Sequence, residues 1–178
     1  MYNEIIQFWF KEIHEAQWWK KDAEFDALIA QRFAVLHEQA SKCELYNWRT
    51  TAEGRLAEII ILDQFSRNMF RGTPASFSND SLALALSQEA IRLGIDKQVS
   101  EKKRGFFYLP YMHSESAAIH DIAVNLYTDL GQKNSLEFEL KHKAIIDRFG
   151  RYPHRNIILG RTSTKEEIAF LSEKESSF

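Results

Sequence analysis

The sequence predicts an all-α fold of about eight antiparallel helices in a single domain covering residues 1–178. Three observations support this prediction. Apolar residues recur with the i, i+3, i+4 spacing of an amphipathic helix. Capping residues and Gly or Pro stops separate these segments. No run alternates with the period of two that is typical of a strand. Because the connections are short, neighbouring helices are expected to pack antiparallel, as in an α-solenoid, although no repeat at the tetratricopeptide period is present.

Three helices are predicted in the first part of the chain. Asn3 is suited to cap a short first helix. Asp22 opens a longer helix whose apolar stripe fades after Ala40. The sequence Thr50-Thr51-Ala52-Glu53 resembles a capping box and predicts a helix that extends to about Phe70. A Gly-Thr-Pro sequence then ends it.

Two further helices are predicted in the middle of the chain. Ser78 or Asn79 caps the first of them, and Gly94 closes it. Ser100 caps the second, which Pro110 interrupts or ends because proline lacks the N–H that an interior helical position donates. These boundaries follow from local sequence alone.

The remaining part of the chain predicts two longer helices and one short one. The first begins at Ser114 or Ser116 and is stopped by Gly131. The second begins at Ser135 and is stopped by Gly150. A last short helix begins at Thr164, where Glu167 occupies the reciprocal position of a capping box.

Composition excludes several classes of protein. The formal charge of −2 gives no overall attraction to DNA or to an anionic membrane. The single cysteine, Cys43, excludes an internal disulfide. No stretch approaches the roughly 20 apolar residues of a membrane helix. Residues 1–11 lack the apolar core of a signal peptide. We therefore expect a soluble cytoplasmic protein whose many aromatic side chains form its core.

A polar motif occupies the end of the third predicted helix. Asp63 and Arg67 stand four residues apart in the order that favours an intrahelical ion pair. The polar side chains of this motif either face solvent or line a wetted cavity. Their amide and guanidinium groups suit fixed hydrogen-bond geometry. Asp80 is expected to cap the next helix or to face an arginine. The motif supplies five candidate ligand-binding residues: Asp63, Gln64, Arg67, Asn68 and Arg71.

A second motif, Tyr108–Glu115, places a proline just before a histidine and an acid. His113 and Glu115 are candidate binding residues, and His113 is a candidate general base, a metal ligand or a structural hydrogen-bonding group. His120 follows seven residues later, which is too far to chelate one ion with His113 unaided. We therefore expect no metal and no cofactor. His142 is expected to be a surface or core residue.

The stretch 148–164 holds four arginines and a histidine and no acid. Guanidinium forks suit carboxylate or phosphate, so this loop requires a negative partner. That partner is either an external anion or the protein's own carboxylates, with Asp63, Glu115 and Asp147 as candidates. The loop also leads to a helix N-terminus, which favours anions. Its candidate ligand-binding residues are Arg148, Arg151, His154, Arg155, Asn156 and Arg161.

These motifs together resemble a known family. The chain is similar over nearly its whole length to the bacterial family called domain of unknown function 924. The resemblance implies a tetratricopeptide-like all-helical fold and no assigned activity. Two positions depart from the family pattern: a proline often stands where this chain has Ser66, and His120 lies outside the pattern. The matching segments are Phe8-Trp9-Phe10, Trp19 with Asp22 and Phe25-Asp26, Leu62 to Asn68, Arg71-Gly72-Thr73, Pro110 to Glu115, Arg148 to Asn156, Leu159-Gly160-Arg161 and Ser163-Thr164.

Two functions are compatible with these features. The first is a small anionic ligand, phosphorylated or carboxylic, held in a cavity between helices that is lined by Arg, His and Asn. Turnover there would need a general acid or base, for which His113 and His154 are the candidates. The alternative is a helical-repeat scaffold that binds a peptide or protein, with the polar motifs as a structural network. RNA binding is a weaker third hypothesis.

Overall fold

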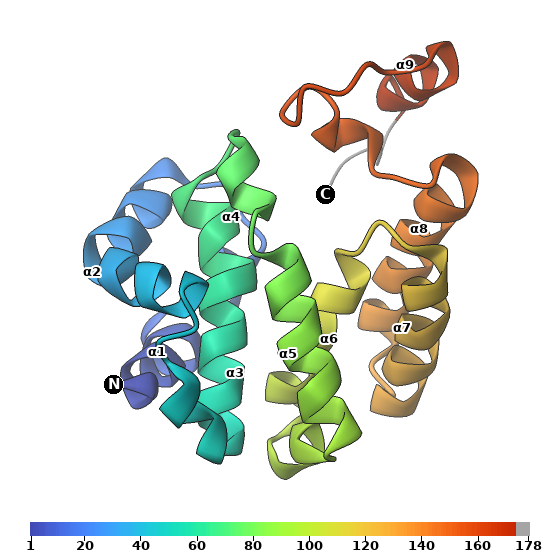
Figure 1. The fold of residues 1–178 in the computed structure, drawn as a ribbon. Helices are drawn as coiled ribbons and strands as arrows, with labels where there is room; N and C mark the ends of the chain where they lie inside the picture. Colours follow the sequence, from blue (N-terminus) through green and yellow to red (C-terminus); the bar gives the residue numbers. More distant parts are fainter. Residues whose placement is uncertain (174–178) are drawn as a thin grey trace. The chain divides into compact units, whose positions relative to one another are not determined.

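The computed structural model describes residues 1–173, and within this range it contains helices and connecting turns but no strand (Figure 1). Eight helices are present if α3 and α4, which are joined by a π-helical turn, count as one. No helix of the described range is long and apolar enough to cross a membrane. The bounds are α1 Tyr2–Gln7, α2 Ala23–Ser41, α3 Ala52–Ile60, α4 Ser66–Met69, α5 Asp80–Arg92, α6 Glu101–Met112, α7 Ala117–Leu130, α8 Lys133–Phe149 and α9 Lys165–Leu171.

Most predicted helix starts are confirmed, and the errors are local. Asp22 caps α2 by accepting bonds from two backbone N–H groups. The predicted cap Asn3 is wrong, because α1 already begins at Tyr2. Thr51, rather than Thr50, caps α3 through the N–H of Gly54, so the predicted box with Glu53 does not form. The helix then continues to Met69, close to the predicted end.

The later helices show the same pattern. Asn79 precedes α5, whereas Asp80 is its first residue and does not cap it. Pro110 lies inside α6, which continues two residues beyond it to Met112. Helix α8 begins at Lys133, two residues before the predicted Ser135. The capping box at the start of α9 is confirmed. Pro110 is tolerated in α6 because it removes only one backbone N–H, close to the end of that helix.

The chain separates into two compact units. The N-terminal unit comprises Met1–Arg71 and Ala75–Pro110, and the C-terminal unit comprises Gly72–Pro74 and the residues from Tyr111 onward. In the N-terminal unit α1 packs on α3, α2 packs on α4, and α3 packs on α5. In the C-terminal unit α7 packs along α8. The assignment of one domain to residues 1–178 stays a prediction.

Large aromatic side chains form the core of the N-terminal unit, as expected. The rings of Phe8 and Phe33 lie 4.9 Å apart, and those of Phe33 and Phe65 lie 5.1 Å apart. Trp9 meets Phe65 edge to face at 5.4 Å. All four side chains are almost completely buried. Edge and offset contacts between aromatic rings add to the free energy of burial. These rings therefore fix α2 and the turn that follows α1 against the helix formed by α3 and α4.

A smaller core holds the C-terminal unit together. Ile145 and Ile146 of α8 pack with Tyr152, and Phe149 and Phe170 cover the same cluster. Gly150 ends α8 in the left-handed conformation, with φ of 69°, which glycine adopts without a Cβ clash. The chain therefore turns sharply after α8, and Tyr152 returns to the side of the helix that it has just left.

Candidate functional site

The polar motif at the end of the third predicted helix is partly buried inside the N-terminal unit. Asp63 and Gln64 lie in the π-helical turn Ile61–Phe65, and they expose only 1% and 6% of their surface. Asn68 is buried as well. Arg67 is partly exposed and Arg71 is exposed, so the alternative of an exposed polar face fails for Asp63, Gln64 and Asn68 but holds for Arg71. A π turn widens the helix locally and is frequently found at functional sites.

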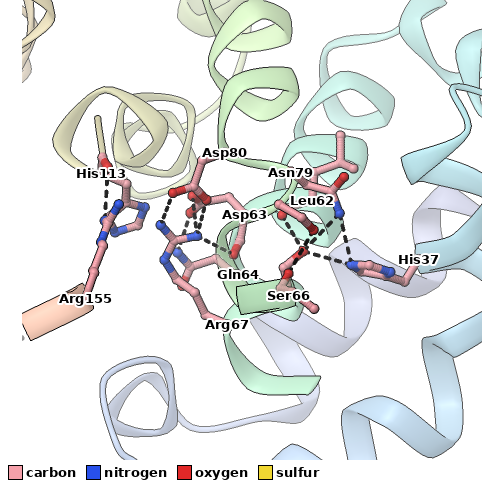
Figure 2. A network of polar contacts seen from close by, with 12 residues as sticks. His37, Leu62, Asp63, Gln64, Ser66, Arg67, Asn79, Asp80, His113 and Arg155 are labelled. Carbon is pink, nitrogen blue, oxygen red and sulfur yellow. Dashed lines mark hydrogen bonds and ion pairs between the residues drawn. The ribbon is translucent and has the colours of Figure 1, made fainter. Parts of the chain in front are cut away.

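An ion-pair network surrounds this motif (Figure 2). Arg67 NH1 lies 3.2 Å from Asp63 Oδ1, which confirms the predicted pair. The same guanidinium donates two bonds to Asp80, at 2.8 and 3.0 Å. Asp80 therefore faces an arginine, the second of its two predicted roles. A bidentate bond to a partly buried carboxylate fixes both planes, so Arg67 is held in one orientation.

Asp26 of α2 joins the other members of the motif. It accepts a 2.7 Å bond from Asn68 Nδ2. It also accepts two bonds from Arg71, at 2.6 and 2.9 Å. These bonds link residues more than 40 positions apart and tie α2 to α4. Asn68 and Arg71 thus have an internal carboxylate as their partner.

A histidine and two small polar residues form a second group of buried polar side chains in this unit (Figure 2). His37 Nε2 lies 2.8 Å from Ser66 Oγ, and Ser66 Oγ donates to the carbonyl of Leu62. Asn79 Nδ2 donates to Ser41 Oγ at 3.0 Å. Burial lowers the pKa of His37, so the imidazole is neutral at physiological pH. The Ser66 hydroxyl hydrogen is donated to the Leu62 carbonyl oxygen. The serine is fully buried, which suits a structural role.

Acids of the protein itself bind several arginines of stretch 148–164, namely Arg148, Arg151 and Arg161. Arg148 binds the exposed Glu166 at 3.0 Å. Arg151 donates two bonds to Glu167 of α9, at 2.7 and 2.9 Å. The bond from Arg151, together with the cap N–H of Thr164, lowers the pKa of Glu167 to about 2. Asn156 donates to Ser163 at 3.1 Å, which braces the same loop.

Glu115 is the acid that joins the second motif to this loop. It accepts two bonds from Arg161, at 2.6 and 2.9 Å, and one of 2.7 Å from the backbone N–H of Tyr152. Burial acts to raise the pKa of Glu115, but these bonds outweigh it and the pKa is lowered. Glu115 is thus confirmed as an internal partner. Asp147, another candidate, instead binds Lys143 one helical turn away at 2.8 Å.

Tyr152 lies at the centre of a group of basic side chains. The guanidinium carbon of Arg155 stands 4.5 Å above its ring. The imidazoles of His154, His142 and His120 lie 5.5, 5.8 and 6.3 Å from it. Arg155 also donates a 3.0 Å bond to the carbonyl of His113. We call this group, Tyr152 with His120, His142, His154 and Arg155, the Tyr152 cluster.

The histidines of the cluster differ in their environments. His142 is buried, and this burial lowers its pKa to about 3, with smaller contributions from His113, His120 and His154. It is therefore neutral at physiological pH. His120 is completely buried and contacts Glu139 through Nδ1 at 2.7 Å. His113 and His154 are only partly buried. Arg155 is the permanent cation of the cluster, and its side chain is oriented by the Tyr152 ring.

This arrangement combines a fixed guanidinium group with two partly exposed imidazoles. Guanidinium N–H groups bind carboxylate and phosphate oxygens, and an imidazole can donate to or accept from the same ligand. Within residues 1–173, no group of three or more His, Cys, Asp or Glu is arranged to hold a metal ion. The site is therefore suited to anion binding and to proton transfer.

Sequence reasoning missed several participants. Tyr152, His120, Glu139 and Asp26 were not among the predicted site residues, although each makes contacts that organise those residues. The position of Tyr152 directly after a helix-ending glycine and next to Arg151 was a usable signal, because such a residue is forced back against its own helix. The positions of Glu139 and Asp26 within amphipathic helices gave no comparable indication.

Within residues 1–173, the fold and the buried polar groups define an all-helical protein. The family model of bacterial proteins of unknown function (DUF924) matches residues 5–175, and the chain belongs to this family. This confirms the resemblance that the sequence motifs indicated.

One solved structure is closely similar. It is the protein of unknown function ATU0120 from Agrobacterium tumefaciens, with a TM-score of 0.91 and 44% sequence identity. The match covers 96% of this chain and 96% of that one. Among curated proteins, none matches the chain.

Proposed function

We propose that the protein binds a small anionic molecule, phosphorylated or carboxylic, through Arg155, His113 and His154 of the C-terminal unit. The observation that carries the proposal is the gathering of Arg155 and His154 around Tyr152, with the backbone of His113 bound to Arg155. Arg155 stacks on the ring at 4.5 Å and bonds the carbonyl of His113 at 3.0 Å. His154 lies against the same ring. An oriented guanidinium group loses little entropy on binding an anion.

The remaining loop arginines support the site without contributing to binding in this proposal. Arg151 and Arg161 are bound to Glu167 and Glu115, so they fix the loop that carries Arg155. If the bound molecule is turned over, His113 and His154 are the groups that could move a proton, because both are partly exposed. It stays a prediction that the N-terminal motif takes part in ligand binding. The residues of this motif are Asp63, Gln64, Arg67, Asn68 and Arg71.

A thermal-shift experiment tests this proposal. Inorganic phosphate and a panel of phosphorylated and carboxylic metabolites are added to the wild type and to Arg155→Ala. A ligand present at about 100 times its Kd adds about 2.7 kcal/mol of stability. For a chain of this size that corresponds to a rise in Tm of about 5–10 °C. Arg155→Ala is expected to fold and to show no such rise.

Arg148→Ala is the matched control, because it removes the same charge from the same stretch but from an exposed pair. It should keep the full ligand shift. His154→Gln is a second probe that leaves Arg155 in place, and it should weaken binding while the protein stays folded. If no anion shifts the wild type, or if His154→Gln and Arg155→Ala both bind as the wild type does, the proposal is wrong.

Three broader expectations belong with this proposal. The helices are suited to a tetratricopeptide-like superhelix, and the protein is expected to reside in the cytoplasm without binding DNA. A peptide-binding scaffold is the competing function. In that case Arg155 belongs to a structural network, and Arg155→Ala would unfold the protein instead of removing a ligand.

A further inference from the structure

The pair formed by His120 and Glu139 lies outside the proposed ligand groups and is completely buried. Both side chains are 0% exposed. His120 Nδ1 lies 2.7 Å from Glu139 Oε1, which joins α7 to α8. His120 Nε2 lies 2.9 Å from the carbonyl oxygen of Ser114. The imidazole therefore connects helix α8 to the segment 113–116 that precedes α7.

The number of protons in this arrangement follows from the chemistry of its atoms. A carbonyl oxygen only accepts, so Nε2 must carry a hydrogen to bond Ser114. Nδ1 and Glu139 Oε1, at 2.7 Å, need a second hydrogen between them. The two bonds thus require two protons. If one is removed, either Nδ1 faces a carboxylate without a hydrogen, or Nε2 faces the Ser114 carbonyl without one.

We propose that Glu139 is a neutral carboxylic acid in the folded protein, that it donates to His120 Nδ1, and that this proton holds the segment 113–116 in place. Glu139 and His120 are positioning residues for His113 and Glu115. The pair acts through hydrogen bonds only, and no covalent bond between heavy atoms forms or breaks. Loss of the proton to solvent releases either the bond to α8 or the bond to Ser114.

Two observations place the second proton on Glu139 instead of on His120. An imidazolium paired with a carboxylate would bury two full charges, which costs more than burying two neutral groups. In addition, no described residue donates a hydrogen bond to Glu139 Oε2, which is also buried. An ionised carboxylate would leave that oxygen charged and without a donor, whereas the carbonyl oxygen of a neutral acid tolerates this at lower cost.

The surrounding charges are consistent with this assignment. Burial raises the pKa of Glu139 above its ordinary value of 4.5, and the opposing effects of His120 and Lys143 are smaller. Lys143, one turn later on α8, is bound to Asp147 and Asp121. The neighbouring His142 is neutral at physiological pH, and Tyr152, from the loop after α8, contacts Nε2 of His120 at 3.3 Å.

The sign of the pH effect follows. Above about pH 4.5 the unfolded chain releases the Glu139 proton, while the folded protein keeps it until the raised pKa is reached. In this window Glu139 itself carries one more proton in the folded protein than in the unfolded chain. Stability from this group is therefore complete at low pH and is lost as the pH rises. Relative to Glu139→Gln, the equilibrium constant for unfolding of the wild type should increase by up to about tenfold per pH unit within the window.

Glu139→Gln is the decisive variant, because its amide donates to Nδ1 in the same shape and cannot ionise. We expect it to fold at neutral pH and to lose this component of the pH dependence, measured by urea unfolding from about pH 5 to about pH 9. The infrared band of a protonated carboxylic acid should be present in the wild type at neutral pH and absent in Glu139→Gln. Glu166→Gln, which changes an exposed acid, should keep both wild-type properties.

Three results would overturn the assignment: a wild type without the carboxylic acid band, a Glu139→Gln variant with the wild-type pH slope, or one that does not fold at neutral pH. Amide hydrogen exchange in residues 113–116 should be faster in Glu139→Ala than in Glu139→Gln, because only the glutamine holds His120. Equal exchange would also contradict the positioning role. None of these measurements depends on phosphate binding. They therefore test the assignment of Glu139 even if no anion binds at Arg155.

Discussion

Tyr152 is a single residue whose two ends perform different tasks. Its ring contacts three imidazoles and the Arg155 guanidinium. Its hydroxyl donates to the carbonyl of Met112 and lies 3.3 Å from His120 Nε2. Its backbone N–H donates to Glu115. A large aromatic residue with a polar end can therefore order a guanidinium group and several imidazoles around one ring.

Tyr152→Phe separates these tasks. The ring stays, so the stacking of Arg155 should be retained, but the buried carbonyl of Met112 loses its donor. We expect a loss of about 1–3 kcal/mol in the free energy of unfolding, measured with urea. Tyr152→Leu also removes the ring and should cost more. A phenylalanine variant as stable as the wild type would show that the hydroxyl contributes nothing.

Single residues also mark the limit of sequence reasoning about the site. The ion pair of Asp63 and Arg67 was predictable, because i, i+4 partners are neighbours on any helix. The partner of Arg161 was only one of several candidate acids, and Glu115 is 46 residues away. No local rule selects among acids at that separation, since the choice depends on which helices meet.

At the scale of elements, local rules gave the helices but placed some starts incorrectly. Several helices start or stop where expected. The starts are marked by Asp22 and Thr164, and the stops by Gly94, Gly131 and Gly150. The π turn Ile61–Phe65 was not foreseen. Every residue from 56 to 66 is buried, so this helix is enclosed on all its faces and Asp63 and Gln64 lie inside the unit instead of facing solvent.

Helix α3 depends on the absence of one side chain. A Cβ atom on Gly54 would lie 2.1 Å from the carbonyl oxygen of Trp48, in the turn that precedes the helix. Gly54→Ala should therefore lower the free energy of unfolding by about 2 kcal/mol or more, although alanine is the better helix former by about 1 kcal/mol. Urea unfolding measures the change. A more stable variant would contradict the close approach of turn and helix.

At the scale of the whole molecule, acid should weaken the fold through two buried groups. His142 has a pKa of about 3, so as the pH falls below 6.5 the unfolded chain gains a proton that the folded protein does not bind. The stability from this group is lost between these two values. Glu167, with a pKa of about 2, adds a loss between 4.5 and 2, because its bound carboxylate resists protonation.

His142→Phe isolates the first contribution. The variant lacks the proton-binding group and also the bond from Nδ1 to the carbonyl of Phe138, so it should be less stable than the wild type at neutral pH. Its disadvantage should shrink as the pH falls from 6.5 toward 3, because only the wild type loses the His142 contribution. Urea unfolding at several pH values measures the difference. A constant difference would contradict a neutral buried imidazole.

The sequence by itself determined the helices, several of their ends and the existence of three polar motifs, because helical periodicity and capping depend on residues within four positions of one another. The tertiary structure alone decided which groups meet. It joined Asp26 to Asn68 and Glu115 to Arg161, and it buried His120 with Glu139. The physical reason is that a carboxylate has no preference among distant cations until helix packing removes water and leaves one of them within reach.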